Sequence, residues 1–366
     1  MLEHYFITSY VALIWSFIFA IGTAAVFKFF KSSDLNHKKK RAAHSQATSR
    51  LGGLAVCSSI AVVTLLESNT WNIEILIAVL PIFIAGLLED MGWPLKPQLR
   101  LAIASLSAVI FIAFKGRVIN DVGIEWANLV LSVTPIAIAF TIFCIVALVN
   151  ALNFIDGVNG LASGKTIVSS FALMWLSIKF NEPNLTLLGV AMFSASLGLF
   201  LINYPTGRIF LGDAGAYTIG FLLAVALITL QSRYSEISAW SILLLIFWPI
   251  ADMAHSILRR KLNRKRSDRP DYLHLHHVMM RSVIILSRGR IPKGWANPIA
   301  TAIILPLATV PVVIGLMCYQ NNALCMTLFF GFMLLFACTH AGIIWITRRR
   351  IVLMDRSKKK GFTEKN

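Results

Sequence analysis

The segment NALNFIDGVNGLASG, residues 150–164, carries regularly spaced polar side chains directly after residues 129–149, which contain no charge. If the preceding helix continues into the segment, Asn150 and Asn153 lie one turn apart on one face, and Asp156 continues that face. Glycines would then end the helix and allow the backbone to approach a ligand. Two amides and a carboxylate suit a cation or a sugar nucleotide. A polar helix cap that satisfies its own carbonyls is the structural alternative.

The stretch RIFLGDAGAYTIGF, residues 208–221, places Asp213 where a helix would begin, between Gly212 and Gly215. Asp is a preferred N-cap, so a purely structural role is one interpretation. Small neighbours also leave room for a phosphate at the helix N-terminus, where backbone N–H groups and the helix dipole favour anions. A magnesium ion between Asp213 and that phosphate would use both features.

The stretch RPDYLHLHHVMMRS, residues 269–282, contains the histidines His274, His276 and His277. Neighbours this close in sequence cannot all converge on one tetrahedral zinc ion. We expect them to act, together with Arg269 and Arg281, as donors to an anionic or polyhydroxylated substrate. A basic amphipathic helix in the membrane interface is the alternative.

The elements that must position these residues are membrane helices. The 366-residue chain is 57% hydrophobic and 14% charged, and its apolar residues form long unbroken runs. Runs of ~17 to 25 apolar residues can cross a bilayer as helices, so we expect an all-α polytopic membrane protein. About eleven transmembrane helices are predicted: Phe6–Phe30, Gly52–Leu66, Ile73–Leu88, Leu99–Phe114, Leu129–Val149, Thr166–Ile178, Leu185–Ile202, Ala214–Gln231, Ala239–Leu258, Pro298–Tyr319 and Ala323–Thr347.

The basic residues predict how the helices are oriented. One side of this arrangement collects 30 of the 34 Lys and Arg residues, so the positive-inside rule makes that side cytoplasmic. The N-terminus is then outside and the C-terminus inside. We expect a single transmembrane domain over residues 1–347, with a basic cytoplasmic tail at 348–366. Its cytoplasmic loops are residues 31–50, 89–98, 150–165, 203–213 and 259–297.

Unusual polar residues fall on this cytoplasmic side. Glu89 and Asp90 end the third apolar run, and Asp252 lies near the cytoplasmic end of the ninth. A carboxylate within a span costs up to roughly 2.5 to 3.5 kcal/mol on insertion scales, so such residues are rare without a partner or a function. The carboxylates are therefore expected to share a site with the stretches described above.

The net charge of +17 does not indicate nucleic acid as a partner. The membrane topology and the anionic lipid headgroups of the bilayer account for basic clusters beside the spans. The first apolar run lacks a basic n-region and is long enough to span, so no cleavable signal is expected. The five cysteines have no metal-ligand spacing and are interpreted as packing residues.

Together these stretches resemble the bacterial polyprenyl-phosphate N-acetylhexosamine-1-phosphate transferases, members of glycosyltransferase family 4 that start O-antigen, enterobacterial common antigen and teichoic-acid linkage units. The resemblance runs from about residue 36 to residue 281 and rests on motifs in the same order on one membrane face. These are AAHSQATSRLGG (42–53), GLLED (86–90), NALNFIDGVNGL (150–161), NYPTGRIFLGDAGAY (203–217), PIADMAHSILRRK (249–261) and HLHHVMMR (274–281).

The resemblance implies transfer of a sugar 1-phosphate from a UDP-N-acetylhexosamine, GlcNAc or a 6-deoxy derivative, to undecaprenyl phosphate, with release of UMP. It implies Mg²⁺ as cofactor, with Mn²⁺ as an alternative, at the cytoplasmic face of the bacterial inner membrane; a homodimer is left open. The implied metal ligands are Asn153 and Asp213, the catalytic carboxylates are Glu89, Asp90 and Asp156, and the substrate-binding residues are Arg50, Asn150, Asn159, His274, His276, His277 and Arg281.

The sequence departs from the family pattern at three positions. The usual paired aspartates read Glu89-Asp90, a second aspartate is replaced by Asn159, and the usual proline before Arg50 is Ser49. We favour Asp90 over Glu89 for the chemistry, because the extra methylene of Glu89 displaces its carboxylate. A phosphate monoester has a second pKa of about 6 and is largely a dianion already, so the carboxylates are expected to hold metal and orient anions more than to remove a proton.

Other functions remain open at this point. A transporter or flippase would also be polytopic with polar residues in its spans, but it places them near the midplane, often in repeated halves. A lipid-binding scaffold without activity is a further alternative. Within the enzyme class, phospho-MurNAc-pentapeptide transfer is the alternative reaction, and the identity of the donor sugar and of the polysaccharide is left undetermined.

Overall fold

The computed structural model describes residues 2–31, 49–66, 70–263, 271, 273–288 and 290–363. Most of the predicted 31–50 loop, part of the 259–297 loop, residues 42–48 of the first motif and the last residues of the tail lie outside this range. The described residues form fourteen helices: α1 Leu2–Lys31, α2 Gly52–Leu66, α3 Thr70–Asp90, α4 Pro97–Lys115, α5 Glu125–Leu131, α6 Thr134–Phe154, α7 Leu161–Lys179, α8 Pro183–Asn203, α9 Gly212–Arg233, α10 Ala239–Leu245, α11 Phe247–Leu262, α12 Leu275–Leu286, α13 Lys293–Met317 and α14 Asn322–Thr363.

The protein is an all-helical, multi-pass membrane protein. Within the described residues, nine helices are long and apolar enough to cross a membrane, and α10 and α11 make a tenth span if the bent pair is counted as one. Each of the eleven predicted runs is largely helical, although the fifth is interrupted at residues 132–133, between α5 and α6. The second, α2, has only 15 residues, which is short for a span, so nine or ten of the expected eleven spans are supported by length and composition among the described residues.

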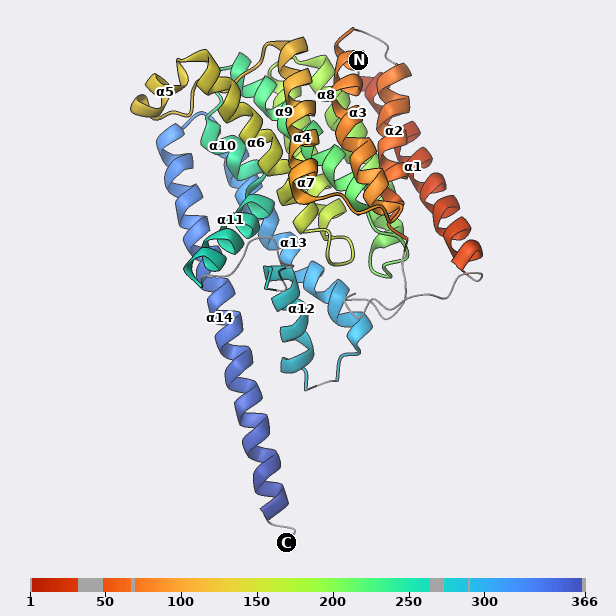
Figure 1. Ribbon diagram of the computed structural model, residues 1–366, viewed down its shortest axis with the longest axis vertical. Helices are drawn as coiled ribbons and strands as arrows, with labels where there is room; N and C mark the ends of the chain where they lie inside the picture. The colour runs from red at the N-terminus through yellow and green to blue at the C-terminus, as the bar shows by residue number, and fades with distance from the viewer. Residues whose placement is uncertain are drawn as a thin grey trace.

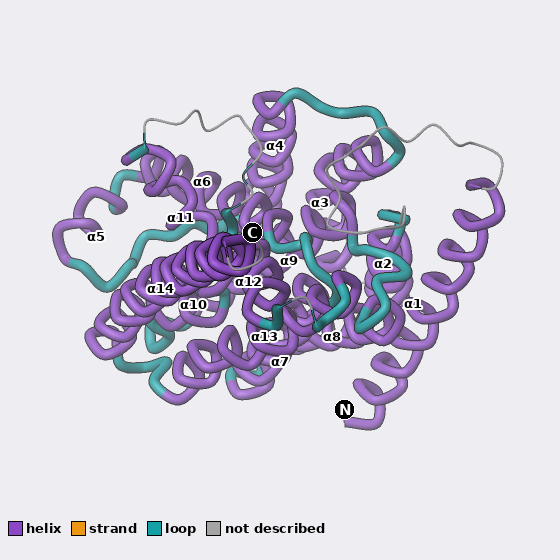
Figure 2. Tube along the Cα trace, turned by 90° about the horizontal axis from the view of Figure 1, so that it is seen from below, coloured by secondary structure: helices purple, strands orange, loops and turns teal. Residues whose placement is uncertain are grey.

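Helix α9 is the centre of the bundle. Its apolar stretch is 94% buried, and it packs against α3 and α6, with α2 also in contact. Seen along the bundle, α1 and α2 lie at one edge and α5 and α14 at the opposite edge, with α9 between them (Figure 2). In the outer helices α1 and α14, only 22% and 17% of the residues of the apolar stretch are buried, as expected for faces that contact lipid.

The two ends of the chain lie at opposite ends of the bundle (Figure 1). Helix α1 starts at one end, and α14 continues beyond the other as a long extension. This arrangement agrees with termini on opposite sides of a membrane. That the end carrying α12 faces the cytoplasm stays a prediction from the basic residues.

Glycines bring α2 and α3 into backbone contact with the start of α9. A Cβ atom on Gly53 would lie 2.3 Å from the backbone nitrogen of Gly215, and one on Gly86 would lie 2.5 Å from the Cα of Ala214. Side chains cannot be accommodated at these distances. The N-terminus of α9 is therefore held directly against the ends of two other helices.

The predicted ninth span is broken. Helices α10 and α11 meet at Ile246 at an angle of 89°. A break frees backbone carbonyls, which need other donors inside a membrane protein. The carbonyl oxygen of Leu245 accepts hydrogen bonds from Lys165 Nζ at 3.0 Å and Ser169 Oγ at 2.8 Å. Buried Lys165 of α7 thus has a structural role, because it donates a hydrogen bond to a carbonyl that the break leaves free.

Candidate active site

A group of acidic and amide side chains, Asp90, Asn153, Asp156 and Asp213, meets at the N-terminus of α9 and is called the carboxylate cluster below. The Oδ1 and Oδ2 atoms of Asp90 accept the backbone N–H groups of Asp213 at 2.9 Å and Ala214 at 2.8 Å. Asp156 Oδ2 accepts the N–H of Gly212 at 2.9 Å. Two carboxylates from outside the helix therefore satisfy its first N–H groups.

The Asp213 side chain points to the remaining members. Asn153 Nδ2 donates to Asp213 Oδ1 at 2.5 Å, and Arg50 Nη1 lies 3.6 Å from Asp213 Oδ2. The Arg50 side chain is 64% exposed, whereas that of Asp213 is 20% exposed. The residues expected to share a metal ion are thus brought together from α3, α6 and α9, at a point that solvent reaches.

Gly212 is required for this geometry. Its φ of +74° lies in the left-handed region, and a Cβ there would lie 2.0 Å from the carbonyl oxygen of Arg50. Backbone hydrogen bonds join the same segments, from Phe210 N to Ser49 O at 2.9 Å and from Gly52 N to Phe210 O at 3.0 Å. Ser49, where the family has proline, accepts one of them through its carbonyl.

The local roles of the aspartates differ from those drawn from the sequence. Helix α9 begins at Gly212, so Asp213 lies in its first turn, and Asp90 and Asp156 provide the caps. The N–H groups of the first turn are occupied by these carboxylates, which leaves less room for a phosphate there than the sequence indicated. Helix α6 does continue past Val149, as expected, but it ends at Phe154, and Asp156 follows in a turn.

Glu89 faces away from this contact and belongs to a separate triad. Its Oε2 accepts the hydroxyl of Tyr217 at 2.7 Å, and its Oε1 lies 3.7 Å from Arg100 Nη1. Arg100 also donates to Tyr217 Oη at 3.1 Å. The longer side chain of Glu89 therefore reaches a partner on α9, and its charge is paired with a cation from α4.

Two amides of the predicted site are engaged by the protein itself. Asn159 is 3% exposed; its Nδ2 donates to Pro205 O at 2.7 Å, and its backbone N–H donates to Asn297 Oδ1 at 2.6 Å. Asn150 Nδ2 donates to the carbonyl of Val146 at 2.8 Å, one turn back in α6. These hydrogen bonds hold the backbone of the segments that carry the two amides. Within the described residues, neither amide forms a hydrogen bond with the carboxylate cluster.

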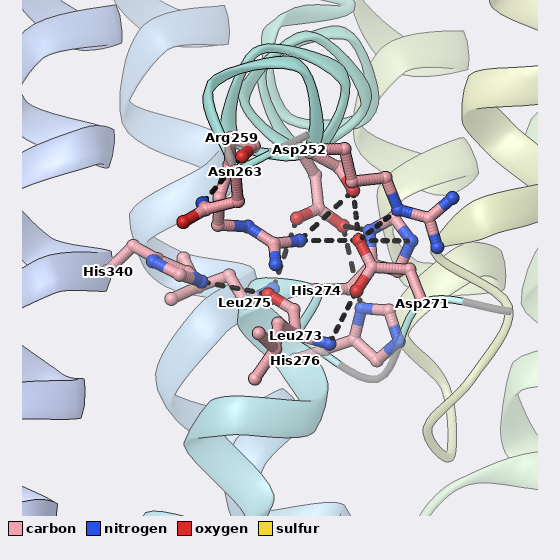
Figure 3. Close-up of polar contacts among 11 residues, drawn as sticks. Asp252, Arg259, Asn263, Asp271, Leu273, His274, Leu275, His276 and His340 are labelled. Carbon is pink, nitrogen blue, oxygen red and sulfur yellow. Dashed lines mark hydrogen bonds and ion pairs between the residues drawn. The ribbon is translucent and has the colours of Figure 1, made fainter. Parts of the chain in front are cut away.

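The histidine segment forms a second group, the histidine cluster, defined as Asp252, Asp271, His274, His276 and His277. Asp252 of α11 accepts the backbone N–H of Leu275 on Oδ1 at 3.1 Å, and its Oδ2 lies 3.0 Å from His274 Nδ1 (Figure 3). His274 is the N-cap residue of α12. Asp252 thus caps α12 as Asp90 caps α9, and it orients the first histidine.

Asp271 fixes the chain that enters α12. It accepts hydrogen bonds from Ser256 and Arg259 of α11 and from the backbone N–H of Leu273. Although burial alone would raise the pKa of Asp271, these hydrogen bonds and the positive charge of Arg259 lower it to about 2. Asp271 is therefore ionised at neutral pH and belongs to an anchored ion pair.

His276 and His277 lie against the turn that carries Asp156. A Cβ on Gly157 would lie 2.5 Å from His276 Nε2 and 3.2 Å from His277 Cε1, so Gly157 brings the two clusters together. Burial, followed by the positive charges of neighbouring histidines and Arg281, lowers the pKa of His277 to about 3. His277 is then neutral in the cell and can offer a substrate one N–H, without a positive charge.

The other predicted substrate residue, Arg281, donates from Nε to the carbonyl of His277 at 3.3 Å and is exposed. Its guanidinium carries the positive charge that His277 lacks. In the turn between the clusters, burial raises the pKa of Asp156 to about 7, and the negative charge of Asp213 adds to the rise. A cation bound beside Asp156 would oppose this shift.

The carboxylate cluster fits magnesium chemically. Within the described part of the chain, no three His, Cys, Asp or Glu side chains form a ready metal site. Mg²⁺ does not need one, because it is usually held by one or two carboxylates, together with substrate phosphates and water. The cluster offers hard oxygen donors only, which are the ligands that Mg²⁺ prefers.

Some participants were missed from the sequence. Tyr217 and Arg100 hold Glu89, and Asn203 ties Gly160 to Ile209 through its side-chain amide. His340 contacts the histidine segment from α14. A histidine within an apolar span was an available indication, since such residues usually face a protein interior and a partner; the others depend on contacts between distant segments.

The sequence of this chain is similar to those of known bacterial proteins. Residues 72–231 match Glycosyl transferase family 4. The probable undecaprenyl-phosphate N-acetylglucosaminyl 1-phosphate transferase of Bacillus subtilis is 25% identical over 288 residues, 76% of this chain and 79% of that protein. The undecaprenyl-phosphate alpha-N-acetylglucosaminyl 1-phosphate transferase of Thermotoga maritima is 27% identical over 271 residues, 74% and 81% of the two chains.

The protein of the same name from Escherichia coli K12 is 30% identical over 204 residues, 54% of this chain and 55% of that protein. The family match spans every member of the carboxylate cluster. Over residues 72–231 the chain is therefore similar to the enzymes of glycosyl transferase family 4.

Proposed function

We propose that this enzyme transfers GlcNAc 1-phosphate, or the 1-phosphate of a 6-deoxy N-acetylhexosamine together with its sugar, from the UDP-sugar to undecaprenyl phosphate and releases UMP. The observation that carries the proposal is the meeting of Asp90, Asn153 and Asp213 at the start of α9. The names of the relatives support the same reaction. The product would begin O-antigen or another cell-surface polysaccharide, in the inner membrane of a bacterium with the site facing the cytoplasm.

Asn153 and Asp213 would hold Mg²⁺, or Mn²⁺ in its place, and Asp90 would keep Asp213 in position through its backbone N–H. When bound, the ion would neutralise charge on the donor diphosphate. Asp156 lies next to this site and would add negative charge to it once ionised. Arg50, exposed beside Asp213, is suited to contact a substrate phosphate.

In the reaction, an oxygen of the lipid phosphate attacks the phosphorus that bears the sugar, and UMP leaves. The attacking phosphate is largely dianionic at neutral pH, since its second pKa is about 6. Its oxygen needs no general base, so the main barrier is the approach of two anions. Arg50 and Arg281 would reduce that repulsion. Because the hydrogen-bond donors of the site are already held in place, they would not have to reorient as charge moves during the reaction.

The histidine cluster would bind the donor's diphosphate and sugar. Asp252 holds His274, while Gly157 lets His276 and His277 approach the turn beside Asp156. Neutral His277 would donate one hydrogen bond, and Arg281 would supply charge. Asn150 and Asn159 would act on the substrate through the backbone they anchor, with Asn159 near the uridine.

The experiment that tests this function is UMP release by purified protein in detergent with Mg²⁺ and undecaprenyl phosphate. The donors would be UDP-GlcNAc, UDP-N-acetyl-6-deoxyhexosamines and UDP-MurNAc-pentapeptide. We expect release with one of the simple N-acetylhexosamine donors, dependent on the lipid. Release only with UDP-MurNAc-pentapeptide would assign the alternative reaction, and absence of release with every donor would contradict the proposal.

A further inference from the structure

The ring of His340, near the middle of α14, contacts the chain just before the histidine cluster. His340 is 3% exposed, and its Nε2 lies 2.8 Å from the carbonyl oxygen of Leu273 (Figure 3). A carbonyl can only accept, so the ring N–H donates. Leu273 immediately precedes His274, the N-cap residue of α12.

Both backbone polar groups of Leu273 are therefore held. Its N–H donates to Asp271 Oδ1 at 2.9 Å, and Asp271 is bound to Arg259 of α11. Its carbonyl is held from the opposite direction by His340. The turn into α12 is thus fixed between α11 and α14.

A second contact joins α12 to α14. Ser282 Oγ and Thr347 Oγ1 lie 2.9 Å apart in a buried position, two turns into α12. This contact holds the body of the helix, whereas His340 holds its entry. The direction in which the histidines leave the backbone depends on the entry, because His274 lies before the first helical turn.

We propose that His340 is a positioning residue for the donor site: by holding the Leu273 carbonyl, it fixes the backbone from which His274, His276 and His277 project. The proposal rests on the proposed function, in which these histidines bind the sugar diphosphate. The main neighbours of α14 are α10, α11 and α12, while the carboxylate cluster is built on α3, α6 and α9. We therefore expect His340 to affect donor binding more than the carboxylate cluster, which it reaches only through the histidines that lie against Gly157.

Loss of the ring leaves the part-buried Leu273 carbonyl without this donor. The peptide would turn toward another donor and draw His274 away from Asp252, whose Oδ2 lies 3.0 Å from the ring. A glutamine at this position has a side-chain N–H at a similar distance from the backbone and can restore the hydrogen bond. An alanine cannot.

The kinetic test compares His340→Ala and His340→Gln with Cys338→Ala, a control at an exposed position two residues earlier on α14. His340→Ala should raise KM for UDP-GlcNAc about tenfold, the equivalent of one lost hydrogen bond, with KM for undecaprenyl phosphate and kcat changed less than about threefold. His340→Gln should recover most of the affinity. Equal losses toward both substrates, or no change in His340→Ala, would overturn the proposal.

Hydrogen–deuterium exchange of the purified protein without substrate gives a readout that does not depend on the reaction. His340→Ala should increase amide exchange over residues 273–286, while His340→Gln and Cys338→Ala leave it as in the wild type. Exchange that is unchanged in His340→Ala, or raised throughout the protein, would refute positioning. If the wild type releases no UMP with any donor, the proposed function fails, and the exchange result still decides whether His340 holds the turn.

Discussion

The carboxylate of Asp90 accepts the backbone N–H of Asp213 at 2.9 Å, across 123 residues of sequence. One side chain thereby caps α9 and places the carboxylate of Asp213, whose Oδ1 receives the amide of Asn153 at 2.5 Å. The acidic residues at the ends of α3 and α9 thus form one unit. This unit makes the position of Asp213 depend on Asp90.

Substitutions of Asp90 can show whether this residue mainly positions Asp213 or removes a proton from the substrate. Asp90→Asn keeps one oxygen acceptor for the N–H groups of Asp213 and Ala214, whereas Asp90→Ala keeps none. We expect kcat to fall about tenfold in Asp90→Asn and at least about 100-fold in Asp90→Ala. The measurement is UMP release against pH. If Asp90→Asn recovers steeply at high pH, Asp90 acts as a base and positioning is not its main role.

Close packing of α3 on α9 should be sensitive to one methyl group. Gly86→Ala would place a Cβ 2.5 Å from the Cα of Ala214, so the helices must separate, at a cost of about 1 to 3 kcal/mol of unfolding free energy. Gly331→Ala on α14 meets nothing within 4 Å and is the control. Thermal unfolding in detergent should show a lower midpoint for Gly86→Ala only. Equal midpoints for both variants would argue against this contact.

The length of Glu89 is expected to matter through Tyr217. Glu89→Asp cannot span the present 2.7 Å contact without a backbone shift, and Tyr217→Phe lacks the hydroxyl. Each should lower kcat by about tenfold, and the double variant should lose little more, since both remove the same hydrogen bond. A Glu89→Asp enzyme as active as the wild type would instead show that the hydrogen bond between Glu89 and Tyr217 is not needed for the reaction.

His277 should make stability fall in mild acid. Its pKa of about 3 in the folded protein lies below the value of 6.5 expected when unfolded. The unfolded chain therefore takes up a proton first, and folded stability decreases as pH falls below 6.5, by about 1 to 2 kcal/mol at pH 5. His277→Gln removes the imidazole and with it this pH dependence of the folding stability. Chemical unfolding at pH 7 and pH 5 should show a smaller difference for His277→Gln, and an unchanged difference would contradict a neutral His277.

The sequence predicted the class of fold and the meeting of Asp90, Asn153 and Asp213, because long apolar runs identify spans and basic loops identify the side on which polar residues gather. It did not predict the break at Ile246, since residues 239–258 read as one apolar run. Pro249 was the available indication: it lies in the first turn of α11, where proline needs no backbone donor.

Local roles within the site were harder to predict. Asp213 looks like a helix cap from its neighbours, yet Asp90 provides that cap because α3 packs against α9 at Gly86. Asn159 reads as a ligand-binding amide in sequence, and its partners Pro205 and Asn297 come from distant segments. Such contacts depend on tertiary packing, which local spacing does not encode.

The most direct test of the central claim is the Mg²⁺ dependence of UMP release from UDP-GlcNAc and undecaprenyl phosphate in wild type and Asp213→Asn. Removal of the ion with a chelator should abolish wild-type release, and adding Mg²⁺ should restore it. If Asp213 holds the ion, Asp213→Asn should need at least about tenfold more Mg²⁺ for half-maximal rate, or show no release at any concentration. An Asp213→Asn enzyme with the wild-type Mg²⁺ response would contradict the account.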